Sequence, residues 1–289
     1  MILDGNKLAL QIQEEIKDKI KLVTTKNKPI KLSVILVGDD MASQIYVAGK
    51  MKACSRAGIK FELIKMPAKT TQNKLEKTIK QLNDDKEVTG ILLQLPLPHH
   101  LNSSKALNCI LPDKDVDGLT DINLGRLFVG DTDGLIPCTP RGVMLLLGRN
   151  NIDLVGKRVA MIGRSNLVGK PLSALLTKAN ATVTLCHTKT VNLPSITKQS
   201  DIVITAVGKR NFITANMIKK GAVVVDIGIN RNEQGKVCGD VDFVKVSKKA
   251  SAITPVPGGV GPMTIAMLMN NLVIAYERQK MSKKSKWNT

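Results

Sequence analysis

The sequence predicts an α/β protein of two domains, each with a parallel sheet covered by helices on both faces. Its 289 residues are enough for two domains of ordinary size. Short apolar runs alternate with helix-length amphipathic segments along the whole chain, a pattern typical of parallel sheets. The turn-rich segment Asp131–Pro140 separates the halves and is expected to be a hinge. We therefore expect domains at residues 1–139 and 140–261, with the last helix, 262–289, completing the first domain.

Three apolar runs in the first half are expected to be strands: Leu32–Val37, Phe61–Met66 and Gly90–Gln94. Amphipathic helices are expected between them, at Ser43–Ala57 and Gln72–Asn83.

In the second half, four strands are expected: Arg158–Ile162, Thr182–Cys186, Ile202–Ala206 and Val223–Ile227. The segment Pro262–Gln279 is expected to be a helix long enough to pack back onto the first domain.

Composition excludes several classes of protein. The 43 basic and 24 acidic residues give a net charge of +19, but the lysines are spread along the chain and only Arg278–Lys286 is locally dense. We therefore expect no nucleic-acid partner, and an anionic small molecule fits the charge equally well. Five scattered cysteines and three histidines have no zinc spacing, so no metal site is expected. No apolar run approaches the roughly 20 residues of a membrane span, and the N-terminus does not resemble a signal peptide; a cytoplasmic protein is expected.

Residues 157–170, KRVAMIGRSNLVGK, read as a strand, a glycine-bracketed turn and the start of a helix. Gly163 and Gly169 stand at the first and last glycines of a G-x-G-x-x-G motif. Ser165 takes the place of the middle glycine, and the spacing is one residue longer. Because exposed backbone N–H groups at a helix N-terminus bind phosphate well, the loop predicts a Rossmann-type domain for a nucleotide cofactor.

The cofactor is expected to be NADP rather than NAD. The second strand of a Rossmann unit ordinarily ends in a carboxylate that binds the ribose 2′-hydroxyl. Here it runs into His187, Thr188 and Lys189, and Arg164 in the glycine loop adds a guanidinium. A hydroxyl group and cations suit a 2′-phosphate better than a free ribose.

Candidate catalytic groups lie in the first half. Ser43 is a plausible N-cap, and Tyr46 and Lys50 lie one helical turn apart. A Tyr-x-x-x-Lys pair also marks short-chain dehydrogenases, but there it follows the nucleotide loop, whereas here it precedes it. A lysine whose pKa is lowered by its surroundings is suited to proton transfer.

Three further segments offer groups that could contact a ligand: two polar side chains and the exposed backbone of a glycine-rich loop. Gln94 ends a buried strand and places an amide at the edge of the sheet. Asp117, between Val116 and Gly118, offers a carboxylate to a heterocycle with adjacent N–H donors. The loop TPVPGGVGPMT, residues 254–264, exposes backbone that could approach a ligand closely.

Taken together and in order, these motifs identify a family resemblance. Tyr46-x-x-x-Lys50, QLPLP, DVDG, PCTP, GRSNLVGKP and PVPGGVGPMT closely resemble the bifunctional methylenetetrahydrofolate dehydrogenase/methenyltetrahydrofolate cyclohydrolases over nearly the whole chain. The resemblance implies a substrate domain, a Rossmann-type NADP domain and a catalytic cleft between them. It also implies a homodimer that acts on a folate with a glutamate or polyglutamate tail, in one-carbon metabolism and purine biosynthesis.

The resemblance also implies residue roles. Lys50 corresponds to the catalytic lysine, Gln94 to the glutamine that tunes its protonation, Tyr46 to the tyrosine that stacks on the folate, and Asp117 to the aspartate that anchors the pterin. Further contacts to the folate are implied for Ser43, Pro257, Gly258, Gly259 and Val260. Contacts to NADP are implied for Gly163, Arg164, Ser165, Thr188 and Ile229.

Two positions depart from the family pattern. Met41 replaces a usual proline, which should loosen the turn before the catalytic helix, and Thr188 replaces a frequent serine but keeps the hydroxyl. Both activities are expected nonetheless. One alternative is a dehydrogenase without cyclohydrolase activity, with NAD as an optional cofactor. The other is a non-catalytic NADP- or nucleic-acid-binding protein on the same scaffold. The retained Lys50 and Gln94 argue against the loss of cyclohydrolase activity, and the segment 187–189 argues against NAD. The intact set of Lys50, Gln94 and Asp117 argues against a non-catalytic protein.

Overall fold

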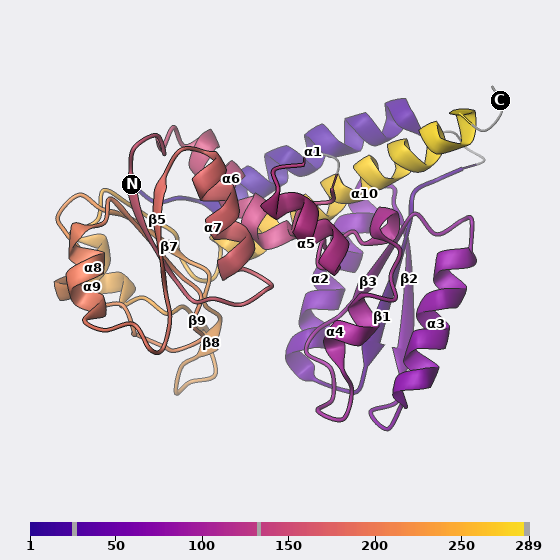
Figure 1. Cartoon of the computed structure of the whole chain (residues 1–289), viewed down its shortest axis with the longest axis horizontal. Coiled ribbons are helices and arrows are strands. Elements are labelled where there is room, and N and C mark those ends of the chain that lie inside the picture. The colour runs from indigo at the N-terminus through magenta and orange to yellow at the C-terminus, as the bar shows by residue number, and fades with distance from the viewer. Residues whose placement is uncertain (25–27, 132–133, 286–289) are drawn as a thin grey trace. The chain divides into compact units, whose positions relative to one another are not determined.

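The computed structural model describes residues 1–24, 28–131 and 134–285, which form two compact units (Figure 1). Unit 1 comprises Met1–Leu10 and Thr139–Thr264, and unit 2 comprises Gln11–Cys138 and Ile265–Thr289. The change of unit between Cys138 and Thr139 falls inside the segment expected to be a hinge, of which residues 132–133 lie outside the described residues.

The N-terminus departs from the expected domain boundaries, because Met1–Leu10 belong to unit 1. Ile2 forms a parallel bridge with Ile253, the Leu3 N–H donates to the Ile253 carbonyl at 2.8 Å, and the Ile253 N–H donates to the Met1 carbonyl at 3.1 Å. The first residues therefore extend the edge of the unit 1 sheet. Because this pairing joins residues about 250 positions apart, no local sequence pattern indicates it.

Unit 2 is built on three parallel strands in the order β2-β1-β3: β1 (Lys31–Val37), β2 (Lys60–Met66) and β3 (Gly90–Leu93). These confirm the three strands predicted for this half, with ends that differ by one residue. Its helical elements are α1 (Gly5–Val23), which starts in unit 1, α2 (Met41–Ala57), α3 (Gln72–Asp84), α4 (Ser103–Leu107), the 3₁₀ helix η1 (Pro112–Lys114), α5 (Asp121–Phe128) and the greater part of α10 (Val260–Ser285). The prediction did not include α1.

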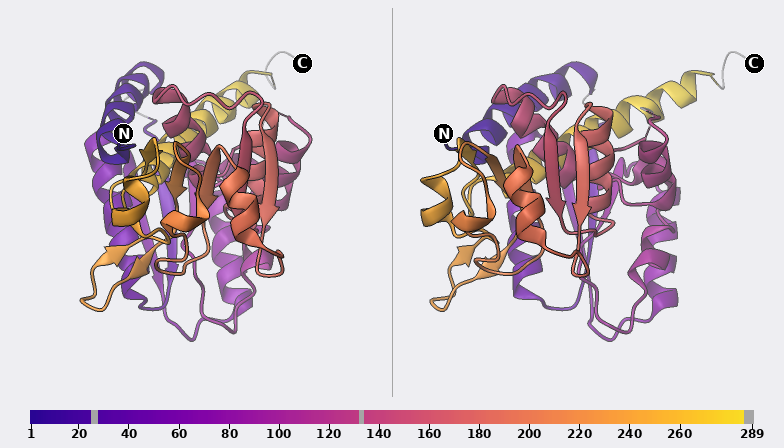
Figure 2. Two further views of the ribbon diagram at one scale, coloured as in Figure 1. Left: turned by 90° about the vertical axis from the view of Figure 1, so that its left-hand side faces the viewer. Right: turned by 60° about the vertical axis from the view of Figure 1, so that its left-hand side comes forward.

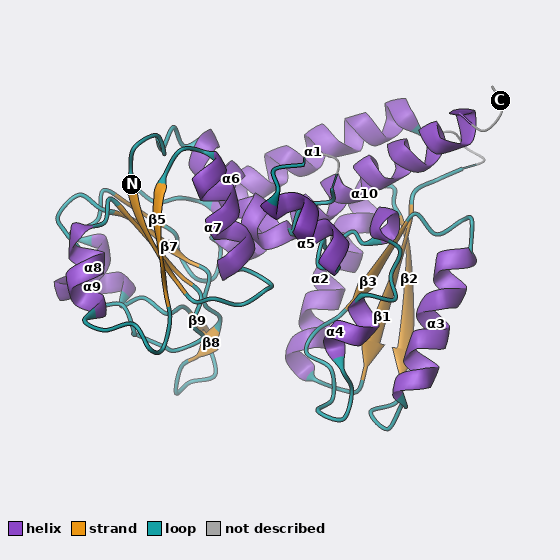
Figure 3. Ribbon diagram, in the orientation of Figure 1, coloured by secondary structure: helices purple, strands orange, loops and turns teal. Residues whose placement is uncertain are grey.

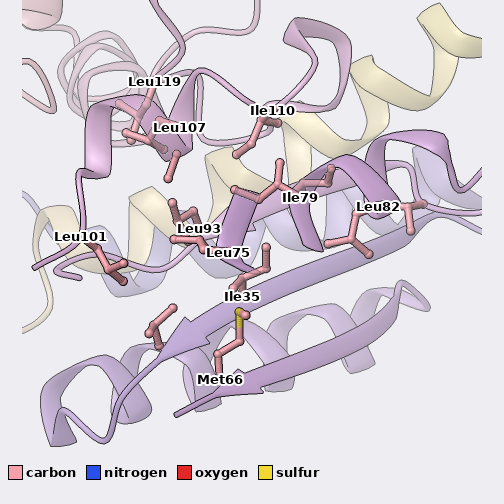
Figure 4. Close-up of a cluster of buried hydrophobic side chains, with 14 residues drawn as sticks. Ile35, Met66, Leu75, Ile79, Leu82, Leu93, Leu101, Leu107, Ile110 and Leu119 are labelled. Carbon is pink, nitrogen blue, oxygen red and sulfur yellow. The ribbon is translucent and has the colours of Figure 1, made fainter. Parts of the chain in front are cut away.

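Aliphatic side chains fill the core of unit 2, as the scarcity of aromatic residues requires. Leu75 and Ile79 of α3 are fully buried and share a cluster with Ile35 of β1 and Leu93 of β3 (Figure 4). Full burial of each such side chain stabilises the fold by roughly 1.5–3 kcal/mol.

A buried lysine completes the packing of α3. The Lys114 ammonium donates to the carbonyl oxygens of Leu82 at 3.0 Å, Asn83 at 2.7 Å and Asp85 at 2.7 Å, where the helix ends. These carbonyls have no partner within the helix, and the positive charge also suits the negative end of the helix dipole.

Replacing Lys114 with methionine should therefore destabilise the protein by about 2–4 kcal/mol, because three carbonyls would lose a charged donor. Chemical denaturation with urea, followed by circular dichroism, measures this effect. The matched control is Lys77→Met, which replaces an exposed lysine of α3 itself. This variant should leave the midpoint of urea unfolding nearly unchanged. Equal midpoints for the two variants would contradict the capping role of Lys114.

Unit 1 contains a five-stranded parallel sheet in the order β10-β7-β6-β4-β5, whose strands lie side by side in Figure 2. The strands are β4 (Arg158–Ile162), β5 (Thr182–Cys186), β6 (Ile202–Thr205), β7 (Val223–Asp226) and β10 (Ala252–Ile253). The first four confirm the prediction within one residue, whereas β10 was not predicted. The chain leaves β4 for β5 on one side and later returns to β6 on the other, which makes the carboxyl end of β4 a topological switch point, where α/β sheets bind ligands.

The remaining elements of unit 1 surround this sheet (Figure 3). They are the helices α6 (Cys138–Arg149), α7 (Gly169–Lys178), α8 (Leu193–Gln199) and α9 (Phe243–Ser247), the 3₁₀ helix η2 (Ala215–Met217), and the antiparallel pair β8 (Asn230–Arg231) and β9 (Val237–Cys238). The alternation of strands and helices confirms the predicted α/β class. In the described part of the chain, no helix is both long and apolar enough to cross a membrane.

Candidate active site

Helix α2 carries Tyr46 and Lys50, and an aspartate caps its N-terminus. The Asp40 carboxylate accepts a hydrogen bond from the Ser43 N–H at 2.7 Å. The nearby Ser43 hydroxyl and this N–H both lower the pKa of Asp40. The prediction that Ser43 is the N-cap is wrong: Ser43 is a buried residue in the first turn. Met41, which replaces the family's usual proline, is the first residue of the helix.

Lys50 and Gln94 form a buried hydrogen bond, as the resemblance implied. The Lys50 Nζ donates to Gln94 Oε1 at 3.0 Å. The Gln94 side-chain amide in turn donates through Nε2 to the Leu95 carbonyl at 2.6 Å, and its backbone N–H donates to the Ile35 carbonyl at 2.9 Å. Because Nε2 already has an acceptor, the amide oxygen faces the lysine. Strand β3 thus holds a fixed acceptor for the lysine.

Burial dominates the electrostatics of Lys50. Removal from water lowers the pKa of its ammonium, and the negative charge of Asp117 opposes that shift. Burial also raises the pKa of the Asp117 carboxyl, and the positive charge of Lys50 opposes it. The two predicted site residues therefore lie near enough to affect each other's charge. A lysine with a lowered pKa is neutral at a lower pH and can accept a proton.

The segment that carries Asp117 is held by residues that sequence reasoning missed. Asn271 of α10 donates through Nδ2 to the carbonyls of Val116 and Ile136, both at 2.9 Å. The Cys138 thiol donates to the Val116 carbonyl at 3.2 Å, and the Cys138 N–H donates to the Asp117 carbonyl at 3.3 Å. Of these two residues, Cys138 belongs to the PCTP motif, so the sequence marked its position. Nothing near Asn271 in the sequence indicated its role.

A second aspartate in the same motif shapes the turn. The buried Asp115 carboxylate accepts from the N–H groups of Gly118 at 3.0 Å and Thr120 at 2.8 Å, and from Asn123 Nδ2 at 2.9 Å. Gly118 needs its glycine there, because it has a φ of 72° and a Cβ would lie 2.6 Å from the Ile136 carbonyl carbon. DVDG is thus a turn motif that presents Asp117.

In unit 1, the predicted cofactor loop lies at the carboxyl end of β4. Gly163 has a φ of 117°, and a Cβ there would lie 2.5 Å from the Ala206 carbonyl oxygen. A Cβ on Gly169 would lie 1.9 Å from the Gly163 oxygen, so both glycines are required by close packing of the loop against its neighbours. Ser165 Oγ accepts from the Val168 N–H at 3.1 Å, just before α7 begins.

The end of β5 lies beside this loop, because the Gly163 N–H donates to the Cys186 carbonyl at 3.0 Å. Arg164 follows β4, and Thr188 and Lys189 follow β5; all three are exposed. The Thr188 hydroxyl and the cations Arg164 and Lys189 at this sheet edge fit a dinucleotide with a 2′-phosphate.

The Pro257–Val260 segment and Ile229 also lie in unit 1. Ile229 is 51% exposed and follows β7. The Gly258 carbonyl accepts from the Asn6 N–H at 3.0 Å, and a Cβ on Gly5 would lie 1.7 Å from the Gly259 oxygen. The backbone of this loop therefore approaches the chain's own N-terminal residues, which explains its close packing without a ligand. Its contact with folate stays a prediction.

Within the described ranges, no group of three or more His, Cys, Asp and Glu side chains could hold a metal ion. The described cysteines are free thiols, and burial raises the pKa of Cys54 to about 12. A thiol with so high a pKa is a poor nucleophile at neutral pH.

Comparisons with known proteins agree with this geometry. The family description "Tetrahydrofolate dehydrogenase/cyclohydrolase, catalytic domain" matches residues 3–117, and its NAD(P)-binding domain matches residues 137–280. The "Bifunctional protein FolD" of Thermodesulfovibrio yellowstonii is 54% identical over 281 residues, which cover 96% of this chain and 97% of that relative.

Two solved structures are similar over almost their full length. The bifunctional FolD methylenetetrahydrofolate dehydrogenase/cyclohydrolase of Campylobacter jejuni superposes with a TM-score of 0.94 at 50% identity, covering 96% of this chain and 99% of that one. The Trypanosoma brucei enzyme, complexed with NADP cofactor and inhibitor, superposes with a TM-score of 0.92 at 36% identity, covering 96% and 97%.

The matches span both units, and they confirm the predicted family, its fold class and an NAD(P)-binding domain. The chain belongs to the tetrahydrofolate dehydrogenase/cyclohydrolase family.

Proposed function

We propose that Lys50, Gln94, Tyr46 and Asp117 form the folate and proton-transfer site of a bifunctional enzyme. The enzyme oxidises 5,10-methylenetetrahydrofolate to the 5,10-methenyl cation, and then hydrolyses that cation to 10-formyltetrahydrofolate. The buried Lys50–Gln94 hydrogen bond is the observation that carries this proposal, because it presents a lysine with a lowered pKa beside a partly buried carboxylate.

The oxidation needs a hydride acceptor. When bound, NADP⁺ would supply the acceptor for a hydride from the methylene carbon between N5 and N10. Gly163, Arg164, Ser165 and Thr188 would hold the cofactor, and Ile229 would contact it. The fit rests on the sheet edge described above, where Arg164 offers a guanidinium and Thr188 a hydroxyl to the 2′-phosphate.

The hydrolysis needs a base. Water adds to the methenyl carbon and loses one proton. The bond between that carbon and N5 then breaks as the remaining hydroxyl proton passes to N5, which leaves the N10-formyl product. Neutral Lys50 accepts the proton that the water loses, and Gln94 Oε1 holds the Nζ in place. Tyr46, half-buried one turn earlier on α2, stacks on the folate, Ser43 lines the same site, and the Asp117 carboxylate accepts the pterin N–H groups.

The charge of +19 suits a folate with a glutamate or polyglutamate tail. A homodimer, a cytoplasmic location and a place in purine biosynthesis complete the proposal, on the strength of the family resemblance. Sedimentation of the purified protein checks the dimer.

A spectrophotometric assay with methylenetetrahydrofolate tests the proposal as a whole. The methenyl product should form with NADP⁺ much faster than with NAD⁺, and its absorbance should then decay as the formyl product appears. Formation without enzymatic decay would contradict the cyclohydrolase step. An equal rate with NAD⁺ would contradict the choice of cofactor.

The cyclohydrolase rate should rise with pH through the pKa of Lys50, because only the neutral amine accepts a proton. Burial lowers that pKa, so the rising limb should lie below the ordinary lysine value of 10.5. Replacing Gln94 with glutamate places a negative charge where Oε1 now lies 3.0 Å from Nζ. The limb should then move up by about one pH unit or more, and the rate near neutrality should fall accordingly. An unmoved limb in Gln94→Glu would contradict Lys50 as the base.

Replacing Arg164 with serine should reduce the preference for NADP⁺ over NAD⁺ by about 10–100-fold, because a charged hydrogen bond to phosphate is worth roughly 1.5–3 kcal/mol. The ratio of kcat/KM values for the two cofactors measures this. Arg158→Ser is the matched control, since Arg158 is an exposed arginine at the opposite end of the same strand. If both variants kept the wild-type ratio, Arg164 would not contact the 2′-phosphate.

A further inference from the structure

Two buried carboxylates lie together in unit 1, beneath the sheet edge proposed for NADP. Asp226 ends β7 and is 3% exposed, and Asp240 follows β9 and is fully buried. The Asp240 N–H donates to Asp226 Oδ1 at 3.0 Å, so the two residues are in direct contact. Neither belongs to the catalytic or cofactor residues discussed above.

Asp240 gathers the loop that follows β6. Its Oδ2 accepts from the Thr205 hydroxyl at 3.1 Å, the Val207 N–H at 2.8 Å and the Gly208 N–H at 3.3 Å. Its Oδ1 accepts from the Lys209 N–H at 2.9 Å. Three consecutive backbone N–H groups thus converge on one carboxylate, and this convergence determines the path of the loop.

The same pair also holds the loop that follows β7. Asp226 Oδ1 accepts from the Gly228 N–H at 3.0 Å, and Asp240 Oδ1 accepts from the Asn230 Nδ2 at 2.9 Å. Ile229 lies between these two anchored residues and is exposed. Both neighbours of this predicted NADP contact are therefore anchored, Gly228 through its backbone and Asn230 through its side chain, while the Ile229 side chain remains exposed.

Two glycines allow the carboxylates to approach so closely. A Cβ on Gly228 would lie 2.1 Å from the Asp240 carboxyl carbon, and a Cβ on Gly239 would lie 1.9 Å from Asp226 Oδ2. Both positions therefore exclude any side chain. The arrangement is built from β6, β7 and the segment after β9 together.

Burying the carboxylates of Asp226 and Asp240 side by side is energetically unfavourable for the fold. The donors described above are neutral N–H and O–H groups, and burial together with the neighbouring Asp240 charge raises the pKa of Asp226 to about 6. Burial of charge without an opposite charge costs free energy, and backbone N–H groups can be satisfied by neutral acceptors at less expense. A costly buried group at a ligand-binding edge is typical of a functional site.

We propose that Asp240, supported by Asp226, is a positioning residue for NADP: it holds the loops after β6 and β7 in the shape that receives the cofactor. This inference rests on the proposed NADP site. The loop after β6 already lies against the cofactor loop, because a Cβ on Gly163 would lie 2.5 Å from the Ala206 oxygen. Val207, 38% exposed and bonded through its N–H to Asp240, presents a second open aliphatic side chain at this edge. Loops held in their binding shape save the free energy of ordering them when the ligand binds.

Asp240→Asn tests the proposal, because an amide nitrogen cannot accept the hydrogen bonds that one carboxylate oxygen now accepts. We expect the Kd for NADP⁺, measured by calorimetry, and the KM for NADP⁺ to rise about tenfold or more. The KM for methylenetetrahydrofolate should stay within about twofold, and kcat at saturating NADP⁺ should fall far less than kcat/KM.

The matched control is Asp201→Asn. Asp201 also bonds neighbouring strands of this sheet, accepting from the Arg158 N–H at 2.8 Å, but it lies at the opposite edge. Asp201→Asn should leave the KM for NADP⁺ unchanged. If Asp240→Asn lowers the melting temperature but leaves the Kd and KM for NADP⁺ at wild-type values, the pair is merely structural and the proposal is overturned.

Two less disruptive variants test the proposal if Asp240→Asn does not fold. Thr205→Val removes one donor to Asp240, whereas Thr205→Ser keeps it. The valine variant should raise the KM for NADP⁺ by about threefold or more, and the serine variant should restore it; equal KM values for the two would overturn the proposal. A wild-type protein that neither binds NADP⁺ nor oxidises the folate would instead overturn the proposed function itself.

Discussion

Replacing Lys50 with methionine is expected to lower the cyclohydrolase rate by about 10²–10⁴-fold, which is the usual contribution of a positioned general base. Methionine has nearly the same length as the lysine side chain but no proton acceptor. It removes a buried ammonium but leaves the buried Gln94 Oε1 without its donor, so a thermal melt of the variant accompanies the assay. The decay of methenyltetrahydrofolate absorbance, corrected for the uncatalysed reaction, measures the effect.

The formation of methenyltetrahydrofolate from the methylene substrate should be much less affected, because hydride transfer needs no proton acceptor. Lys52→Met is the matched control, since Lys52 lies two residues along α2 and is exposed. Cyclohydrolase activity that persists undiminished in Lys50→Met would show that another group accepts the proton, and the site assignment would fail with it.

Replacing Asp117 with asparagine should raise the Kd for the folate substrate by about 10²-fold. A carboxylate that accepts two adjacent N–H donors makes charge-assisted bonds of roughly 1.5–3 kcal/mol each, and an amide can accept only one of them. The amide nitrogen would also face a donor of the ligand. Titration calorimetry with tetrahydrofolate measures the affinity directly.

Asp121→Asn is the control for this variant, because Asp121 is an exposed carboxylate four residues further along the same segment. The loss of charge at Asp117 should also lower the pKa of Lys50, since that charge opposes the effect of burial. The rising limb of the cyclohydrolase pH profile should therefore move to lower pH in Asp117→Asn. An unchanged Kd in this variant would exclude Asp117 as the anchor of the pterin.

Regular elements were predictable where their local pattern is strong. The strands β4 and β5 match the predicted bounds, because each is a short apolar run with turn residues at both ends. The edge strand β10 was missed, since its two residues carry too little pattern. Helix α1 was missed although Asp4, directly before it, is a suitable N-cap, and its carboxylate accepts from the Lys7 N–H at 3.0 Å.

The prediction that Ser43 caps α2 was wrong because the sequence DDMAS contains more than one residue suited to that position. Asp40, Asp39 and Ser43 all have side chains that can accept from a helix N–H. The structure selects Asp40, and the helix begins directly after it. Only the backbone path out of β1 distinguishes these candidates.

By itself, the sequence determined the α/β class, the central strands and the family, and it supplied the candidate site residues, because these depend on local patterns and ordered motifs. Tertiary structure alone decided that Met1–Leu10 join unit 1 and that Asn271 holds the Asp117 segment from 155 residues away. It also decided that Asp240 gathers two loops beneath the NADP edge. These contacts join residues remote in the chain, and no local propensity encodes them.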